Sequence, residues 1–443
     1  DGAKYPIATS PGSGLDMTRH EYRMMTVSSA YYAIPFWWHY RYTLDRQFLE
    51  AATFPILEEA SKFYLALTER REDGQLQIGP SWAPEQGPLP AYNVNNDLAL
   101  IKVVWEGYVE ACRILGRQTP YLGQVMDSLD RYPTYPQRNG RFLDSATAPE
   151  DLKMAHTGLF AMVYPGGDVD ADHPLADVAA RTIDTFHERA QRLAFVGRQS
   201  LSDVQAWTTQ ALGSARLRRP ERVDHYLADV GLSEYLKPNG MFAIVSNGIF
   251  PSLQAKRAAY DFGDQPRAEW VLVASANTRH GRNRHFQFLE GPSAYLCILN
   301  EMLLQSHRGI LRIFPAVPER IAACSFKDLR AEGAFLVSAR CRAGRSERVE
   351  VHSLQGGACT VRLFRYDGTD RVQTAGPDGD LPHVRIAPDT WRFATQPGGT
   401  YTLTLGGHDE PVDLQPSGAP AGVKRFVDCH GDEVFYGRPG SLV

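Results

Sequence analysis

Residues 46–69 read RQFLEAATFPILEEASKFYLALTE, and this stretch decides the fold class. Its apolar residues recur at intervals of three and four, which places them on one face of an α-helix. These residues are Phe48, Ala51, Ala52, Ile56, Ala60, Phe63 and Leu67. Pro55 falls inside the pattern, where a proline bends or starts a helix. The stretch therefore predicts an amphipathic helix that packs against other helices.

Helical spacing continues over most of the first 330 residues. It covers residues 21–43 and predicts further helices at 96–116, 120–131, 151–163, 174–193, 201–217, 221–230 and 293–306. Between residues 235 and 290 the pattern breaks into short mixed pieces such as FAIVSNGIF. Helices that follow one another in pairs form hairpins, and hairpins packed in a ring form a toroid whose loops surround a cleft.

After Arg330 the pattern changes to alternation of apolar and polar residues, as in FLVSARCRA and YTLTL. Clusters of Gly, Asp and Pro separate these runs, which is typical of an antiparallel β-domain. The tail from residue 406 is rich in Gly and Pro, and we expect it to wrap the surface. The sequence predicts a mainly helical domain over 1–330 and a sandwich-like β-domain over 331–443.

Composition excludes several classes of protein. The net charge is −4, and the basic residues are dispersed rather than gathered in a stripe, so a nucleic-acid partner is not expected. Six scattered cysteines without a CxxC pair argue against a zinc site. The sequence contains no run of about 18 apolar residues, so no membrane-spanning helix is expected. The 20 Tyr, 20 Phe and 7 Trp can line a sugar-binding groove, although most aromatic residues fill a core.

One acidic residue lies on an unusually stiff loop. Residues 79–87 read GPSWAPEQG, and Glu85 follows a proline directly. Proline fixes φ and removes a backbone donor, so a Pro-Glu pair holds its carboxylate more firmly than an ordinary surface loop. This local pattern suits either a turn or a reactive acid.

Two longer segments carry a family resemblance. WWHYRYTLDRQFLEAATFPILEEASKFYLAL (37–67), followed by PSWAPEQG, resembles the glycoside hydrolase family that contains the inverting α-1,2-L-fucosidases, whose motifs are WEHYxFTGD, YPILKEAAEF and PSxSPEN. EMLLQSHRGILRIFPAVPERIAACSFKDLRAEGAFLVSARCRAG (301–344) resembles that family's EMLLQSHxGxIxLLPALP passage into its C-terminal β-domain. The resemblance covers roughly residues 1–355. It implies an (α/α)₆ catalytic barrel followed by the β-domain.

The resemblance also implies a pair of catalytic carboxylates. Glu85 matches the glutamate of the SPEN loop, the general acid, and Trp82 could supply the apolar wall that raises its pKa. Counting back from Glu301 without a gap places Glu290 opposite the aspartate of the family's FQIDGNFGG, which activates water for inversion. A structural alternative stays open for each carboxylate: Glu85 as a solvated loop residue, and Glu290 as a cap of the following helix.

Three histidines and a tryptophan complete the candidate binding residues. MAHTGLFAMVYPG (154–166) corresponds to the family's HRHxSHLxGLYPG; His156 keeps a sugar-contacting position, while the neighbouring arginine is lost, so the substrate can differ from fucose. Trp38 and His39 lie near the end of a predicted helix, and the resemblance implies that this helix end faces the cleft. His285 precedes the candidate base. Core packing or exposed loop charge explains these residues equally well.

Two clusters have simpler explanations than catalysis. In NVNND, Asn96 or Asp97 is expected to cap a helix. Asp168 and Asp170 follow a Pro-Gly-Gly sequence and would bind calcium only with a third ligand nearby.

The predicted function is inverting hydrolysis of a terminal α-L-fucoside or α-L-galactoside-like linkage in an oligosaccharide or polysaccharide, without a metal or other cofactor. Two alternatives remain: a uronate polysaccharide lyase using Tyr92, Asn95 and His156, and a carbohydrate-binding relative without catalysis. The family resemblance favours a secreted or periplasmic protein. The chain begins without Met, and the family's N-terminal β-domain and water-polarising asparagines would precede it, so we expect a truncated or processed form.

Overall fold

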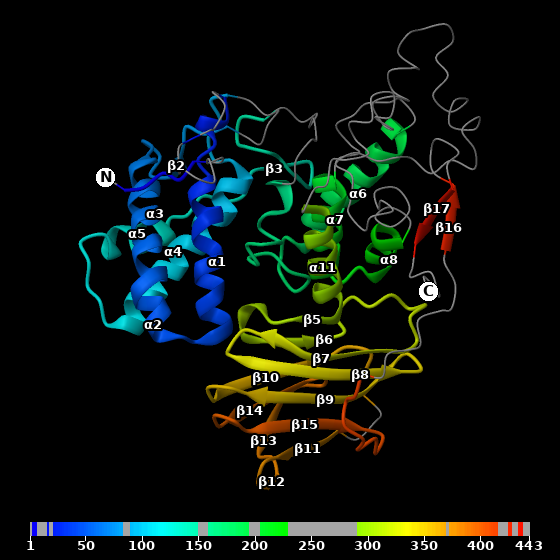
Figure 1. The fold of residues 1–443 in the computed structure, drawn as a ribbon. Coiled ribbons are helices and arrows are strands. Elements are labelled where there is room, and N and C mark those ends of the chain that lie inside the picture. Colours follow the sequence, from blue (N-terminus) through cyan, green and yellow to red (C-terminus); the bar gives the residue numbers. More distant parts are fainter. Residues whose placement is uncertain are drawn as a thin grey trace, which may run out of the picture.

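A computed structural model shows a helical part followed by a layered β-part (Figure 1). The structure describes residues 2–6, 16, 21–82, 89–148, 158–194, 204–228, 290–368, 372–414, 424–427 and 433–436. Three predicted site residues, Glu85, His156 and His285, lie outside these ranges.

The first helical group packs around α4. Its helical segments are η1 (Glu21–Met24), α1 (Ser28–Thr43), α2 (Arg46–Phe48), the π-helical turn η2 (Leu49–Thr53), α3 (Phe54–Ala66), α4 (Asn95–Leu115) and α5 (Leu122–Asp130). Two short hairpins join them, β1 (Thr68–Arg70) with β2 (Leu76–Ile78) and β3 (Gln137–Arg138) with β4 (Arg141–Phe142). Leu57, Ala60 and Tyr64, three and four residues apart on α3, are fully buried, as the helical period requires.

A second helical group lies beside the first. It consists of η3 (Gly158–Phe160), α6 (Ala176–Ala194), α7 (Val204–Arg216), α8 (Pro220–Asp224) and α11 (Glu290–Leu303). Helices α7 and α11 pack lengthwise against each other, and the chain continues from the end of α11 directly into the β-part (Figure 1).

The β-part is built from two layers of strands. One sheet has the order β13-β14-β10-β6-β5 and the other the order β12-β11-β15-β9-β8-β7. The strands are β5 (Leu304–Gln305), β6 (Leu311–Ile313), β7 (Cys324–Ala331), β8 (Phe335–Arg342), β9 (Arg345–Ser353), β10 (Gly357–Leu363), β11 (Val372–Gly376), β12 (Gly379–Asp380), β13 (His383–Ala387), β14 (Thr390–Thr395) and β15 (Thr400–Leu405). Among the described strands, β6 and β10 pair in parallel and the other pairs are antiparallel.

Alternation along the strands fills the space between the two sheets. On β8, Phe335, Val337 and Ala339 are buried and join a core shared with Trp391 and Phe393 of the other sheet. Side chains two residues apart on a strand point to the same face, so this period-two pattern builds an apolar interior. The predicted fold class, helices followed by an antiparallel β-domain, is confirmed.

The first strands of the β-part begin earlier in the chain than the expected domain boundary at residue 330. Strand β5 starts at Leu304, and β6 pairs with β10 in the middle of a sheet. These strands are only two and three residues long, too short to show an alternating pattern in the sequence. The tail also contains a hairpin, β16 (Lys424–Val427) with β17 (Glu433–Tyr436), that the sequence analysis did not predict.

A buried ion pair joins α7 to α11. Arg216, the last residue of α7, binds Glu301 through two nitrogens, with Nη2 2.7 Å from Oε1 and Nε bonded to Oε2. Gln305 of β5 donates from Nε2 to the carbonyls of Ala215 and Glu301, both at 2.9 Å. The end of each helix is thus fixed to the start of the β-part.

A second buried cluster lies next to it. The Asp170 carboxylate is 3.2 Å from both His307 Nε2 and Arg312 Nη2. Burial and the nearby Arg216 charge lower the pKa of His307 to about 3. Burial alone would raise the pKa of Asp170, but the bond from His307 and the charge of Arg312 hold it below its ordinary value. At neutral pH an uncharged imidazole therefore donates to an ionised carboxylate.

These contacts contradict the calcium hypothesis. Asp168 binds Lys102 Nζ at 2.7 Å and accepts a hydrogen bond from the Tyr135 hydroxyl at 3.0 Å. Asp170 is neutralised by Arg312 as described. Both carboxylates therefore serve as partners of side chains that join segments distant in the sequence.

We predict that His307→Gln reduces the acid sensitivity of the fold. An unfolded chain protonates this histidine below about pH 6.5, whereas the folded chain resists protonation down to about pH 3, so stability is lost as pH falls through this window. Glutamine keeps an N–H donor for Asp170 but does not titrate. Urea unfolding should show that the free energy of unfolding falls by about 2 kcal/mol less between pH 7 and pH 5 in the variant than in the wild type. The exposed His408→Gln serves as control, and equal slopes for all three proteins would contradict the prediction.

Candidate functional site

A cavity of about 310 Å³ lies between the two helical groups. This volume is at the lower end of small-molecule pockets, about 300–1,000 Å³. Four segments line it: α1, the turn after η3, α7 and α11. The lining residues are Tyr31, Ile34, Pro35, Trp38, Ala161, Tyr164, Pro165, Thr208, Thr209, Leu212, Glu290 and Ala294. The walls are mostly apolar and aromatic, with one carboxylate.

Helix α1 has two different faces. Tyr31, Ile34, Pro35 and Trp38 are spaced at i, i+3, i+4 and i+7 and line the cavity. On another face Trp37 is buried in the core, where its ring stacks on that of Tyr40 with centroids 5.6 Å apart. The aromatic run that ends α1 therefore divides between cavity and core.

Glu290 occupies the first position of α11 and is exposed at the cavity. Ala294, one turn later, lines the same wall. The positive end of a helix dipole favours a negative charge in its first turn. Glu290 thus presents its carboxyl group at the N-terminal end of α11, within the lining of the cavity.

The aromatic wall opposite α1 is supported by the buried ion pair. The rings of Trp38 and Tyr164 are tilted by 50° with centroids 6.2 Å apart. Behind Tyr164, the guanidinium of Arg216 lies 5.3 Å from the ring centroid while bound to Glu301. Cation–π contact and the ion pair together hold the phenol ring in place.

The loop predicted to carry the acid leaves from fixed ends. Ser81 and Ala91 form an isolated bridge with N···O distances of 2.9 Å and 2.7 Å, which closes the loop at its base. The Trp82 amide donates to the Met24 carbonyl at 3.1 Å, and its ring meets Tyr22 edge to face at 5.3 Å. Glu85 itself lies outside the described residues.

A buried carboxylate lies at the base of this loop. Asp97 accepts a hydrogen bond from Thr26 Oγ1 at 2.6 Å, and the Ser81 hydroxyl lies 3.0 Å from the same Thr26 oxygen. Burial raises the pKa of Asp97 to about 6, although the hydrogen bonds of Ser81 and Thr26 oppose the shift. The loop base, the segment before α1 and the start of α4 are thereby joined.

The predicted helix cap is wrong. The residue before α4 is Val94, which makes no side-chain cap bond, and Asn96 and Asp97 lie inside the first turn. Asn95 is fully buried, and its amide donates to the Leu143 carbonyl at 2.5 Å. An asparagine in this position cannot reach a polymer, which removes one of the residues required by the lyase alternative.

The structure brings together two of the seven predicted site residues, Trp38 and Glu290, in one cavity. His39 is not among the lining residues: it is exposed and its ring lies 4.0 Å from that of Phe48. One residue along a helix turns the side chain by about 100°, which explains the separation from Trp38. Trp82 packs on Tyr22 at the loop base instead.

Sequence reasoning missed Tyr31, Tyr164 and the threonine pair of α7. Tyr31 could have been found, because it is seven residues before Trp38 on the same helical face. Tyr164 lies in the quoted MAHTGLFAMVYPG segment, but its role depends on Arg216, 52 residues later in the chain. Local patterns contain no information about such a contact.

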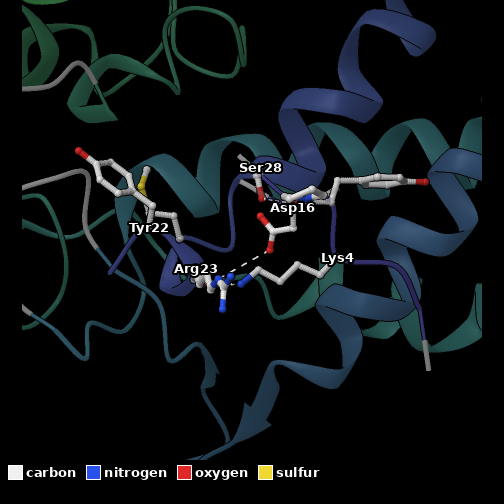
Figure 2. A pocket seen from close by; sticks show the side chains of 8 residues that line it. Lys4, Asp16, Tyr22, Arg23 and Ser28 are labelled. Carbon is white, nitrogen blue, oxygen red and sulfur yellow. Dashed lines mark hydrogen bonds and ion pairs between the residues drawn. The ribbon is translucent and has the colours of Figure 1, made fainter. Parts of the chain in front are cut away.

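Figure 2 shows a second cavity, of about 290 Å³, between the N-terminal segment, η1 and the start of α1. Arg23 Nε lies 3.7 Å from Asp16, and Lys4 Nζ donates to the Arg23 carbonyl. Burial lowers the pKa of Lys4, an effect that Asp16 opposes. Since the carboxylate of this second cavity, Asp16, lies beside Arg23, whereas Glu290 lies at a helix start, the first cavity is the stronger candidate for catalysis.

Two further properties follow from the described part of the chain. Its His, Cys, Asp and Glu side chains form no group of three that could hold a metal ion. None of the helices described is both long and apolar enough to cross a membrane.

Two family models match the chain. The model of the glycosyl hydrolase family 95 catalytic domain matches residues 8–247, which is 240 of the 443 residues. The model of the glycoside hydrolase family 95 C-terminal domain matches residues 305–403. The second match begins at β5, the first strand of the β-part.

Two individual proteins are similar to parts of the chain. Alpha-L-fucosidase 2 of Arabidopsis thaliana is 33% identical over 149 residues, which are 31% of this chain and 18% of the relative. The match thus spans less than a fifth of that relative's length. The solved structure of a candidate kojibiose phosphorylase from the human microbiome superposes with a TM-score of 0.51 at 9% identity, covering 82% of this chain and 51% of that one. At this identity the likeness shows the fold alone.

We predict that Asp97→Asn changes the pH dependence of stability in the opposite direction to His307→Gln. A carboxyl whose pKa is raised by folding destabilises the folded state once it ionises, so the wild type loses stability as pH rises from about 4 to above 6. Asparagine carries no charge to bury. From pH 4 to pH 8 the unfolding free energy of the variant should gain about 3 kcal/mol relative to wild type. Exposed Asp127→Asn is the control, and a pH-independent difference would contradict the prediction.

Proposed function

The chain belongs to glycosyl hydrolase family 95, and from this premise we propose that it hydrolyses a terminal α-L-fucoside or α-L-galactoside-like linkage with inversion. The substrate would be an oligosaccharide or polysaccharide. The family match and the fucosidase named above support the sugar class. The observation that carries the proposal is the cavity that combines Trp38 and Tyr164 with the Glu290 carboxylate.

Each wall of this cavity suits one part of a sugar ring. The C–H groups of a sugar form apolar patches that stack on aromatic rings, and Trp38 and Tyr164 supply two such rings, tilted by 50° with centroids 6.2 Å apart. Thr208 and Thr209 line the same cavity from α7 and place hydroxyl groups near the hydroxyls of a sugar. Ile34 and Leu212 add aliphatic surface that suits the methyl group of a 6-deoxy sugar.

In the proposed reaction, Glu85 is the general acid and Glu290 the general base. Glu290 removes a proton from water as the water attacks the anomeric carbon, and Glu85 donates a proton to the departing glycosidic oxygen. The product has the opposite anomeric configuration. Inverting enzymes keep the two carboxyl groups about 6.5–9.5 Å apart, which leaves room for the water.

The two residues come from different parts of the chain. Glu290 lies in the first turn of α11 and lines the cavity, as the base requires. The acid must be protonated near neutral pH, and the segment that carries Glu85 lies between the two bridged residues Ser81 and Ala91.

A non-catalytic carbohydrate-binding protein is the second candidate. The exposed aromatic cavity would serve binding equally well. Binding without turnover would favour this alternative. Because Asn95 is buried, nothing in the described structure favours the lyase.

We predict that Glu85→Gln and Glu290→Gln each lower kcat by about 10²–10⁴-fold, because each removes one proton-transfer group. The measurement is release of sugar from aryl α-L-fucosides and α-L-galactosides, with the product anomer followed by NMR. Glu221→Gln is a matched control, since Glu221 is also exposed in the first turn of a helix but lies outside the cavity lining. Unchanged turnover in both cavity variants, or a retained anomer, would contradict the proposal.

We further predict that Trp38→Ala raises KM about tenfold with a smaller effect on kcat. Loss of an aromatic stacking surface removes binding in the ground state and the transition state alike. His39→Ala provides the control, because it changes the next residue on α1 without touching the cavity. Equal effects of the two substitutions would argue against sugar stacking on Trp38.

A further inference from the structure

Two cysteines face each other in the β-part, far from the proposed active site. Cys324, the first residue of β7, is the direct cross-strand partner of Cys341 near the end of β8. The two thiols are free and hydrogen-bonded to each other. Directly opposed residues in an antiparallel pair have Cα atoms about 4.5–5.5 Å apart, within the range that a disulfide spans.

The two sulfur atoms differ in accessibility. Cys341 is only 1% exposed, whereas Cys324 is partly exposed at the edge strand of its sheet. A reagent from solvent therefore reaches Cys324 first. Cys341 is placed behind it, where it can react only with its neighbour.

A third residue supplies positive charge. Arg365 donates from Nη1 to Cys341 Sγ at 3.5 Å. The hydrogen bond from Cys324 and the Arg365 guanidinium lower the pKa of Cys341, although burial opposes them, while the pKa of Cys324 is raised by the same hydrogen bond and by burial. These contacts favour the thiolate form of Cys341, and the thiolate is the form that takes part in disulfide exchange.

From this geometry we propose that Cys324 and Cys341 form a reversible redox site in which Cys324 reacts with a low-molecular-weight disulfide and Cys341 completes an internal disulfide. This site is independent of the glycosidase reaction.

The two steps balance as follows. Cys324 sulfur attacks one sulfur of the reagent, its proton passes to the Cys341 thiolate, and the first reagent thiolate leaves. Cys341 sulfur then attacks Cys324 sulfur in the mixed disulfide and expels the second reagent thiolate, to which the remaining proton passes. The cysteine pair loses two electrons, and the reagent disulfide is reduced to one thiolate and one thiol.

The position of the pair gives the disulfide a structural consequence. Besides Cys341, Arg365 binds the carbonyls of Val317, Pro318 and Ile321, in the segment that leads from β6 to Cys324. The β7–β8 turn beyond Cys324 contacts α1: Gly333 donates to the Arg41 carbonyl at 2.8 Å. A disulfide would cross-link strands β7 and β8 between the Arg365 contacts on one side and the Gly333–Arg41 contact on the other.

The experiment treats the folded, fully reduced chain with oxidised glutathione, blocks remaining thiols with an alkylating reagent, and maps peptides without reduction. We expect a linked product that joins the peptide 321–327 to the peptide containing Cys341, with little glutathione adduct on either cysteine. Oxidation should raise the thermal midpoint of unfolding, and a reducing agent should reverse the shift.

Serine variants separate the two roles. Cys341→Ser should accumulate the glutathione adduct on Cys324, because no second sulfur resolves it. Cys324→Ser should leave Cys341 unmodified, because the buried thiol is not reached. Cys297, which is also partly exposed but on α11, is the internal control and should form at most an adduct.

Two results with the wild-type chain, and one with a variant, would overturn the proposal. One is a stable glutathione adduct on Cys324 in the wild type with no internal disulfide. The other is pairing of Cys324 with a cysteine other than Cys341. Cys359→Ser, at another buried cysteine, should form the linked product like the wild type, and its failure to do so would equally contradict the assignment.

Discussion

The buried ion pair between Arg216 and Glu301 is the contact on which the rest of the architecture depends. It connects the ends of α7 and α11, it supports the ring of Tyr164, and through Gln305 it is bonded to the first strand of the β-part. Removing one partner of a buried ion pair leaves an unpaired charge, which typically costs about 3–5 kcal/mol. Replacing both by apolar residues need not destabilise, so the pair is better understood as fixing geometry. Its two hydrogen bonds define one orientation of the guanidinium, and the tyrosine ring follows that orientation.

The same pair has a consequence at the other end of α11. An α-helix rises 1.5 Å per residue, so Glu290 lies roughly 16 Å along the axis from Glu301. A packed helix behaves as a rigid rod over this length, and fixing its C-terminal end against Arg216 sets the position of its first residue. The proposed base is therefore positioned by contacts made at the joint with the β-part. This arrangement gives the β-part a role in the geometry of the cavity although none of its strands lines it.

The sequence predicted the fold where structure is local. The period of α3 and the alternation of β8 each arise from one element burying one face, and both patterns were visible in the residues. It was less successful where partners are distant. Asp170 was interpreted as a possible cation ligand, but its partners His307 and Arg312 are 137 and 142 residues away in the chain. The sequence predicts Asp97 as a helix cap, whereas in the structure Asp97 binds Thr26. No local pattern indicates this contact, because the two residues are 71 positions apart in the chain. Carboxylates look alike in a sequence; the charge that folding brings to them decides their role.

The candidate site shows the same division at the level of single residues. Trp37, Trp38 and His39 are consecutive, and composition treats them alike, yet a helix directs them to the core, to the cavity and to a contact with Phe48. The family resemblance predicts that this segment points toward the cleft, but it cannot separate neighbours that differ by about 100° of rotation. The helical period can separate these neighbours once one residue of the face is known. Starting from Trp38, it identifies Tyr31, Ile34 and Pro35 as residues of the same face. Family motifs and helical geometry therefore supply different information, and both are needed to assign residues to a site on a helical scaffold.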